Sequence, residues 1–164
     1  MNKQSSFFKR KKYFNLDQLD IHIILRNKLV IHGIPEGSFI SSIEPQEKSA
    51  CLILINEDFP ILRDDSDSYC ENLFYELFDK DPIPELDIPR NKAKIFKMDY
   101  DILLGVIQGK FKVELPEDTL IRNIYYDNIK NMIWITLNNA SFNDIEDGEV
   151  PPEIELNVRP VVGV

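Results

Sequence analysis

A repeated segment constrains the fold of this 164-residue chain more than any other feature of its sequence. Residues 115–124 match residues 34–43, with the proline, the glutamate and two isoleucines identical and most other positions alike in class. Pro35 and Pro116 define an offset of 81 residues that persists along both segments. Because each copy of a repeat forms one structural unit, we expect the two halves to fold alike. The sequence therefore predicts a tandem duplication.

Each copy is expected to begin with a short helix and to continue with three strands. Asp17 and Asp99 precede the apolar positions of the two helices, where N-capping residues are favoured. A Pro-Glu turn and a polar hairpin loop then separate short apolar runs, as they do between paired strands. We therefore predict an α+β protein with a mainly antiparallel sheet. The expected strands are residues 29–32, 38–44 and 50–55 in the first copy, and 111–114, 119–126 and 132–137 in the second.

The first copy contains an insertion that the second copy lacks. Pro84 follows Phe59 by 25 positions, whereas the matching Pro152 follows Phe142 by only 10. Apolar side chains within residues 66–80 recur at i, i+4 spacing, which is typical of an amphipathic helix. We therefore predict an inserted helix over this range. Its expected binding residues are Tyr69, Leu73, Phe74, Leu77 and Phe78, and its acidic flanks are Asp64, Asp65, Asp67, Glu71 and Glu76.

Charge is distributed unevenly along the chain, which has a formal net charge of −9. Residues 1–13 contain five basic residues and no acid, whereas residues 57–87 contain eleven acids. The basic segment lacks the periodicity of a helix or strand, so we predict a flexible arm there. The expected organisation is this arm, a first repeat over residues 14–94 that carries the inserted helix, and a second repeat over residues 95–164.

Composition and motifs disfavour several classes of function. No apolar run approaches the roughly 20 residues of a membrane helix, and residues 1–14 lack the apolar centre of a secretion signal, so we expect a cytoplasmic protein. The negative charge argues against direct binding to nucleic acid, which requires clustered Lys and Arg. The chain has no phosphate loop, dinucleotide fingerprint or nucleophile elbow. Cys51 and Cys70 lack zinc-site spacing and are expected to be free thiols. We therefore expect no catalytic residue, metal or cofactor.

The second copy, from Met98-Asp99-Tyr100 through Ser141-Phe142, is similar to small uncharacterised proteins of bacteriophage genomes. The resemblance covers residues 98–142 and identifies no functional family. No activity and no site residue follow from it. It implies an accessory or host-directed role in a phage.

Two functional hypotheses follow from these patterns. In the first, a non-catalytic acidic protein binds a protein partner through the inserted segment, as a phage-encoded inhibitor of a host protein would, including one that imitates the phosphates of nucleic acid. A purely structural role for the inserted helix, as a cover over an exposed sheet or edge, is equally open. The alternative is a small-molecule binding protein, because pockets form where two structural units meet. Tyr100, Tyr125, Tyr126 and Trp134 would line that pocket, although Tyr125 and Trp134 are also large enough to favour burial in the core.

Overall fold

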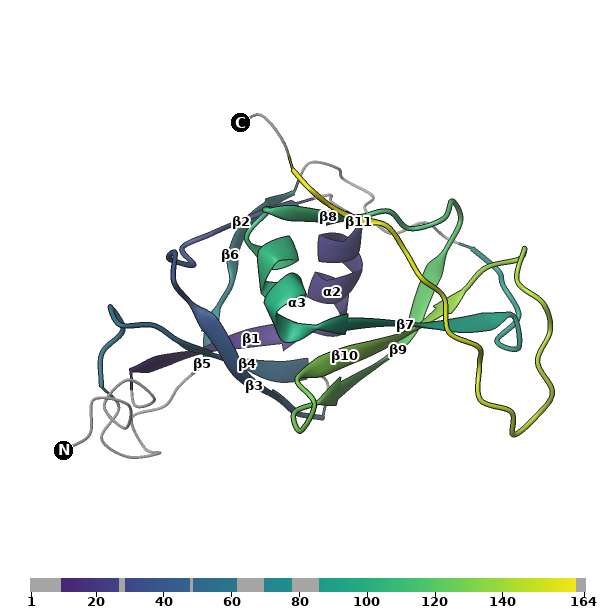
Figure 1. Cartoon of the computed structure of the whole chain (residues 1–164), viewed down its shortest axis with the longest axis horizontal. Coiled ribbons are helices and arrows are strands. Elements are labelled where there is room, and N and C mark those ends of the chain that lie inside the picture. Colours follow the sequence, from purple (N-terminus) through teal and green to yellow (C-terminus); the bar gives the residue numbers. More distant parts are fainter. Residues whose placement is uncertain (1–9, 27–28, 48, 62–69, 78–85, 162–164) are drawn as a thin grey trace.

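Figure 1 shows the computed structural model, which describes residues 10–26, 29–47, 49–61, 70–77 and 86–161. The fold is α+β and mainly antiparallel, with the two described helices side by side against the strands of the larger sheets. No described helix has the length and apolarity needed to cross a membrane. The elements are β1 (Lys11–Asp17), α2 (Gln18–Leu25), β2 (Leu29–His32), β3 (Phe39–Pro45), β4 (Ser49–Ile55), β5 (Cys70–Asn72), β6 (Phe74–Leu77), β7 (Ala93–Asp99), α3 (Tyr100–Ile107), β8 (Phe111–Val113), β9 (Leu120–Asp127), β10 (Met132–Asn138) and β11 (Val158–Pro160).

The two halves of the chain have the same order of elements. The series β1, α2, β2, β3, β4 in the first half corresponds to β7, α3, β8, β9, β10 in the second. The strand order β3-β4-β1 likewise corresponds to β9-β10-β7. Each hairpin has a bulge at the matching position, where Ser41 and Arg122 have no partner in the register. These features agree with the predicted repeat, while the duplication itself stays a prediction.

A buried asparagine holds the Pro-Glu turn in each half. The side-chain amide of Asn56 donates to the carbonyl of Glu36 at 2.9 Å, and that of Asn139 donates to the carbonyl of Glu117 at 2.8 Å. The next residue in the second half, Asp118, has a φ of 56°. A left-handed conformation is costly for a residue other than glycine, and the asparagine bond helps to hold the turn in this form. The turn and the asparagine are therefore one structural unit.

Each helix is preceded by a strand that the sequence analysis did not predict. β1 pairs antiparallel with β4, and β7 pairs antiparallel with β10, so the third predicted strand of each half has neighbours on both sides. The flexible arm predicted for residues 1–13 is therefore wrong for Lys11 to Tyr13, which lie in β1. Those residues are ordered because their backbone groups pair with β4. Residues 1–9 lie outside the described residues.

The predicted helix over residues 66–80 is also wrong, because the described part of this segment forms two short strands. β5 pairs parallel with β1, and β6 pairs antiparallel with β2. An open strand edge presents unpaired N–H and C=O groups, and this segment satisfies them on β1 and β2. This long-range pairing therefore determines the conformation of the segment, in spite of the local i, i+4 spacing. Tyr69, Phe78, Asp64, Asp65 and Asp67 lie outside the described residues.

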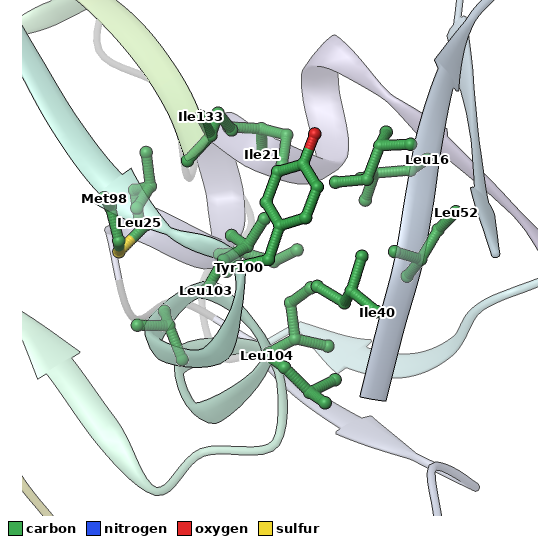
Figure 2. Packing of buried hydrophobic residues seen from close by; sticks show 14 of the residues in the cluster. Leu16, Ile21, Leu25, Ile40, Leu52, Met98, Tyr100, Leu103, Leu104 and Ile133 are labelled. Atoms are coloured by element: carbon green, nitrogen blue, oxygen red, sulfur yellow. The ribbon is translucent and has the colours of Figure 1, made fainter. Parts of the chain in front are cut away.

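One hydrophobic core joins the two halves. Its buried side chains include Leu16 and Leu52 from the first half and Leu103 and Ile133 from the second. Figure 2 shows the ring of Tyr100 at the centre of this cluster, between side chains of both halves. Helix α3 of the second half also contacts β3 of the first. The described parts of the two halves therefore share one interior.

The N-terminal turn of α2 contains a buried carboxyl group. Asp20 is 8% exposed, and its side chain accepts a hydrogen bond from the backbone N–H of Asp17 at 3.1 Å. The Asp17 side chain accepts in return from the Asp20 N–H, which completes the predicted cap. Burial raises the pKa of Asp20 from 3.8 to about 6, because the ionised form loses its hydration. Protonated Asp20 therefore makes its full contribution to the stability of the fold below about pH 4, and this contribution is lost as the pH rises through about 6.

We expect Asp20→Asn to raise the free energy of unfolding by about 1 to 2 kcal/mol near about pH 8 and to change it little near about pH 4. The carboxamide keeps an acceptor for the Asp17 N–H and removes the buried charge. Urea denaturation of both proteins at the two pH values measures the difference. An effect of equal size at both values would contradict the raised pKa.

Candidate functional site

A groove of about 450 Å³ lies between the two halves. It forms where the loop between β3 and β4 of the first half faces β9 of the second. One wall is thus a turn and the other is an edge strand, since β9 ends the order β7-β10-β9. The side chains that define it are Gln18, Glu47 and Ala50 on one side and Ile124, Tyr125 and Tyr126 on the other.

The aromatic residues predicted to line a pocket are divided between this groove and other places. Tyr125 and Tyr126 line the groove. Tyr100 is 2% exposed and belongs to the core. Trp134 lies beside Tyr125 with its ring edge-on, at a centroid separation of 5.9 Å and an angle of 78°. Tyr125 is 61% exposed, so its predicted burial in the core is wrong, because its place in β9 turns it to the outer face of the sheet.

The site in the other half that corresponds to the groove is occupied by side chains of the protein itself. The backbone N–H of Ile43 donates to Oδ1 of Asn128 at 2.9 Å, and Nδ2 of Asn128 donates to the carbonyl of Ile43 at 2.9 Å. The Tyr100 hydroxyl donates to the same Oδ1 at 2.6 Å. Burial raises the pKa of Tyr100, which keeps this hydroxyl protonated. The Asn128 side chain therefore pairs with the edge of β3 as a neighbouring strand would.

The outer face of the second sheet carries the exposed Tyr125 and the half-buried Trp134. In the register, Trp134 of β10 lies between Lys97 of β7 and Tyr125 of β9. The Lys97 ammonium is 4.0 Å from the centroid of the Trp134 ring, a favourable cation–π distance. Ile129, in the turn between β9 and β10, is 96% exposed. We call Lys97, Tyr125, Ile129 and Trp134 the hairpin surface.

The structure does not gather the predicted binding residues of the insertion on one helical face. Leu73 is 8% exposed and belongs to the core, so it contributes to the fold. Glu71 lies in β5 and is half-buried. Phe74, Glu76 and Leu77 lie in β6, next to β2. The described part of the insertion is therefore part of the sheets.

Other reactive side chains are distributed singly or in pairs. Cys51 and Cys70 are free thiols, as predicted, with their Sγ atoms 3.0 Å apart. Burial raises the pKa of the Cys51 thiol to about 12, which keeps it protonated near neutral pH. Burial also lowers the pKa of His22, with a further contribution from Arg26. Within the described ranges, no three His, Cys, Asp or Glu side chains lie together as ligands for a metal ion.

Comparison with protein-family models, with curated proteins and with solved structures gives no match. The resemblance of residues 98–142 to phage proteins therefore stays a prediction. The groove and the hairpin surface share Tyr125, so the two features adjoin one another. Sequence reasoning named Tyr125 and Trp134 but missed Ile129, although an isoleucine in a polar hairpin turn is a readable signal of exposure.

Proposed function

We propose that the protein is a non-catalytic binding protein that engages a protein partner through the hairpin surface. The observation that carries this proposal is the exposure of Tyr125 and Ile129, at 61% and 96%, beside the Lys97 and Trp134 pair. Tyrosine and tryptophan are enriched among the residues that dominate binding energy in protein interfaces. A row of such residues on a paired sheet also needs little ordering when a partner binds.

The charge of the chain indicates the chemistry of the partner. The net charge is −9, and Asp99 and Asp127 lie on either side of Met132 in the sheet register, next to the aromatic row. Surfaces of opposite charge attract over about a Debye length, which is about 8 Å at physiological salt. A partner with a basic surface fits this arrangement best.

The sharper form of the proposal is a phage-encoded inhibitor of a host protein, including one that imitates nucleic acid. A second acidic region spans residues 144–155, where Asp144 pairs with Lys92 at 2.9 Å and Glu153 pairs with Lys97 at 2.5 Å. These pairs reduce the acidic field that a phosphate mimic would present there. The aromatic row is therefore a better-supported contact site than that acidic region.

Affinity capture from an extract of the native host, followed by mass spectrometry and a binding titration, tests the proposal. We expect the double variant Tyr125→Ser with Ile129→Ser to bind the captured partner at least about tenfold more weakly than the parent chain. Val150→Ser is the matched control, because Val150 is 80% exposed and lies outside the hairpin surface. Unchanged affinity of the double variant would refute this surface, and affinity that does not change with salt would refute nucleic-acid mimicry.

A small-molecule binding protein is the second candidate, because the groove lies between the halves, where such a site was expected. The groove has a volume in the range of ligand sites, and it combines aromatic rings with a few polar groups. Capture of a metabolite by the purified protein, with no protein retained from the extract, would favour this candidate.

A further inference from the structure

The groove corresponds to the site in the other half where the Asn128 side chain binds the edge of β3, but the groove is open. Ile43 pairs with Leu52 in the first hairpin, and Ile124 pairs with Ile135 in the second. Both pairs come two register positions after the bulge, so Ile43 and Ile124 have the same orientation in their sheets. Because Ile43 directs its N–H and C=O away from β4 to Asn128, Ile124 is expected to direct the same groups away from β10.

The edge of β9 at Ile124 faces the groove, whereas the edge of β3 at Ile43 is covered. Ile124 lines the groove, and no hydrogen bond from a described loop or side chain reaches its backbone there. An unpaired backbone donor and acceptor at an edge are ready to pair with an incoming polar group. The carboxamide of Asn128 shows which group fits, because it satisfies both atoms of Ile43 at 2.9 Å.

Smaller side chains keep the groove open. Gln18 begins α2 and Tyr100 begins α3, so an exposed glutamine stands where the other half has a buried ring. Ala50 pairs with Leu16 in the first half, where Ile133 pairs with Met98 in the second. The groove is lined by Gln18 and Gln46, but no carboxamide of the described residues is hydrogen-bonded to Ile124 as that of Asn128 is to Ile43. The groove also lacks the phenol ring and part of the aliphatic side chain that the matching site contains.

We propose that this groove binds an Asn or Gln side chain of the protein partner, whose carboxamide pairs with the N–H and C=O of Ile124 beside an aromatic side chain of the same partner. The inference rests on the proposed function and gives its interface a specific pocket next to the hairpin surface. A carboxylate in place of the carboxamide has no hydrogen to donate to the carbonyl and meets the negative charge of Glu47. The groove thus selects the amide over the acid.

A peptide titration of the purified full chain tests this selectivity. The probes are the capped dipeptide asparaginyl-tyrosine N-methylamide and its aspartyl analogue, each followed by the amide resonances of the protein. We expect the asparaginyl probe to shift the Ile124 resonance with saturation in about the millimolar range, which is ordinary for so small a ligand, and the aspartyl probe to leave it unchanged. Equal shifts with both probes, or no shift at Ile124, would overturn the proposal.

Filling the groove provides the second test. Gln18→Tyr introduces the ring that Tyr100 supplies in the other half, and we expect it to abolish the asparaginyl shift and to weaken partner binding at least about tenfold. Leu19→Tyr is the matched control, because Leu19 is the next residue of α2, is 50% exposed and does not line the groove. Unfolding curves of both variants show whether each remains folded. If Gln18→Tyr does not fold, Ala50→Val replaces it as the filling variant.

The outcomes separate this inference from the proposed function. If the filled variant loses the dipeptide but keeps full affinity for the partner, the groove proposal is overturned and the hairpin surface remains. If the parent chain binds the asparaginyl probe but captures no protein, the proposed function is refuted. A side chain of a protein partner is then also refuted as the source of the carboxamide. Loss of both interactions in Gln18→Tyr, with Leu19→Tyr unaffected, is the result that supports the inference.

Discussion

Replacing residues 66–80 with a short linker that repeats the sequence of residues 143–148 is expected to lower the free energy of unfolding by about 3 to 5 kcal/mol. The replacement removes β5 from the edge of β1 and β6 from the edge of β2. It also removes Leu73, which is 8% exposed. Both the lost backbone pairing and the lost apolar burial destabilise the folded state.

Chemical denaturation of the parent chain, the replacement and Leu73→Ala measures this effect. Leu73→Ala should cause only part of the loss, about 2 to 3 kcal/mol, because it keeps the strands and removes one buried side chain. If the replacement unfolds at the same denaturant concentration as the parent chain, β5 and β6 do not stabilise the sheets. That result would favour the predicted binding role of the insertion over a structural one.

The similarity between the two sequence segments made much of the fold predictable. The shared Pro-Glu turn fixed the alignment of the halves, and the strands that follow it in the structure agree with the predicted ranges to within one or two residues. Asp17 and Asp99 cap their helices because a short acceptor side chain before an apolar helical stretch has a strong local preference for that place. These features depend on neighbours in sequence, so the sequence reveals them.

The insertion was not predictable in the same way. A segment as short as residues 70–77 carries apolar residues that suit one face of a helix and also suit a strand. Its conformation is decided by pairing with β1 and β2, whose edges become available only in the folded chain. Local periodicity contains no information on such distant partners.

The groove was predictable in location but not in detail. A pocket was expected at the junction of the repeats, and Tyr125 and Tyr126 do line one there. The structure, however, also shows two differences between the halves at this place, at Gln18 against Tyr100 and at Ala50 against Ile133. These differences are visible when the two halves are aligned. Relating them to the groove, however, requires knowledge of the strand before each helix, which the sequence analysis did not predict.

Tyr100→Ala is expected to lower the free energy of unfolding by about 3 to 5 kcal/mol, the largest effect we predict for a single substitution. The Tyr100 ring is 2% exposed and lies between side chains of both halves (Figure 2). Truncation leaves a cavity at the junction that neither half can close alone. Thermal and urea denaturation of the parent chain and the variant measure the loss.

Two milder substitutions separate the ring from its hydrogen bond. Tyr100→Phe keeps the ring and removes only the bond to Asn128, so we expect a loss of about 1 kcal/mol. Asn128→Ala leaves both backbone groups of Ile43 without the carboxamide, and we expect a loss of about 2 to 3 kcal/mol. Because the hydroxyl and the carboxamide act on each other, the double variant should lose less than the sum of the two single losses. Strict additivity of the two losses would mean that the Tyr100 hydroxyl does not help to hold Asn128 on the edge of β3. The position of Asn128 would then depend only on the packing of the Tyr100 ring and on the hydrogen bonds to Ile43.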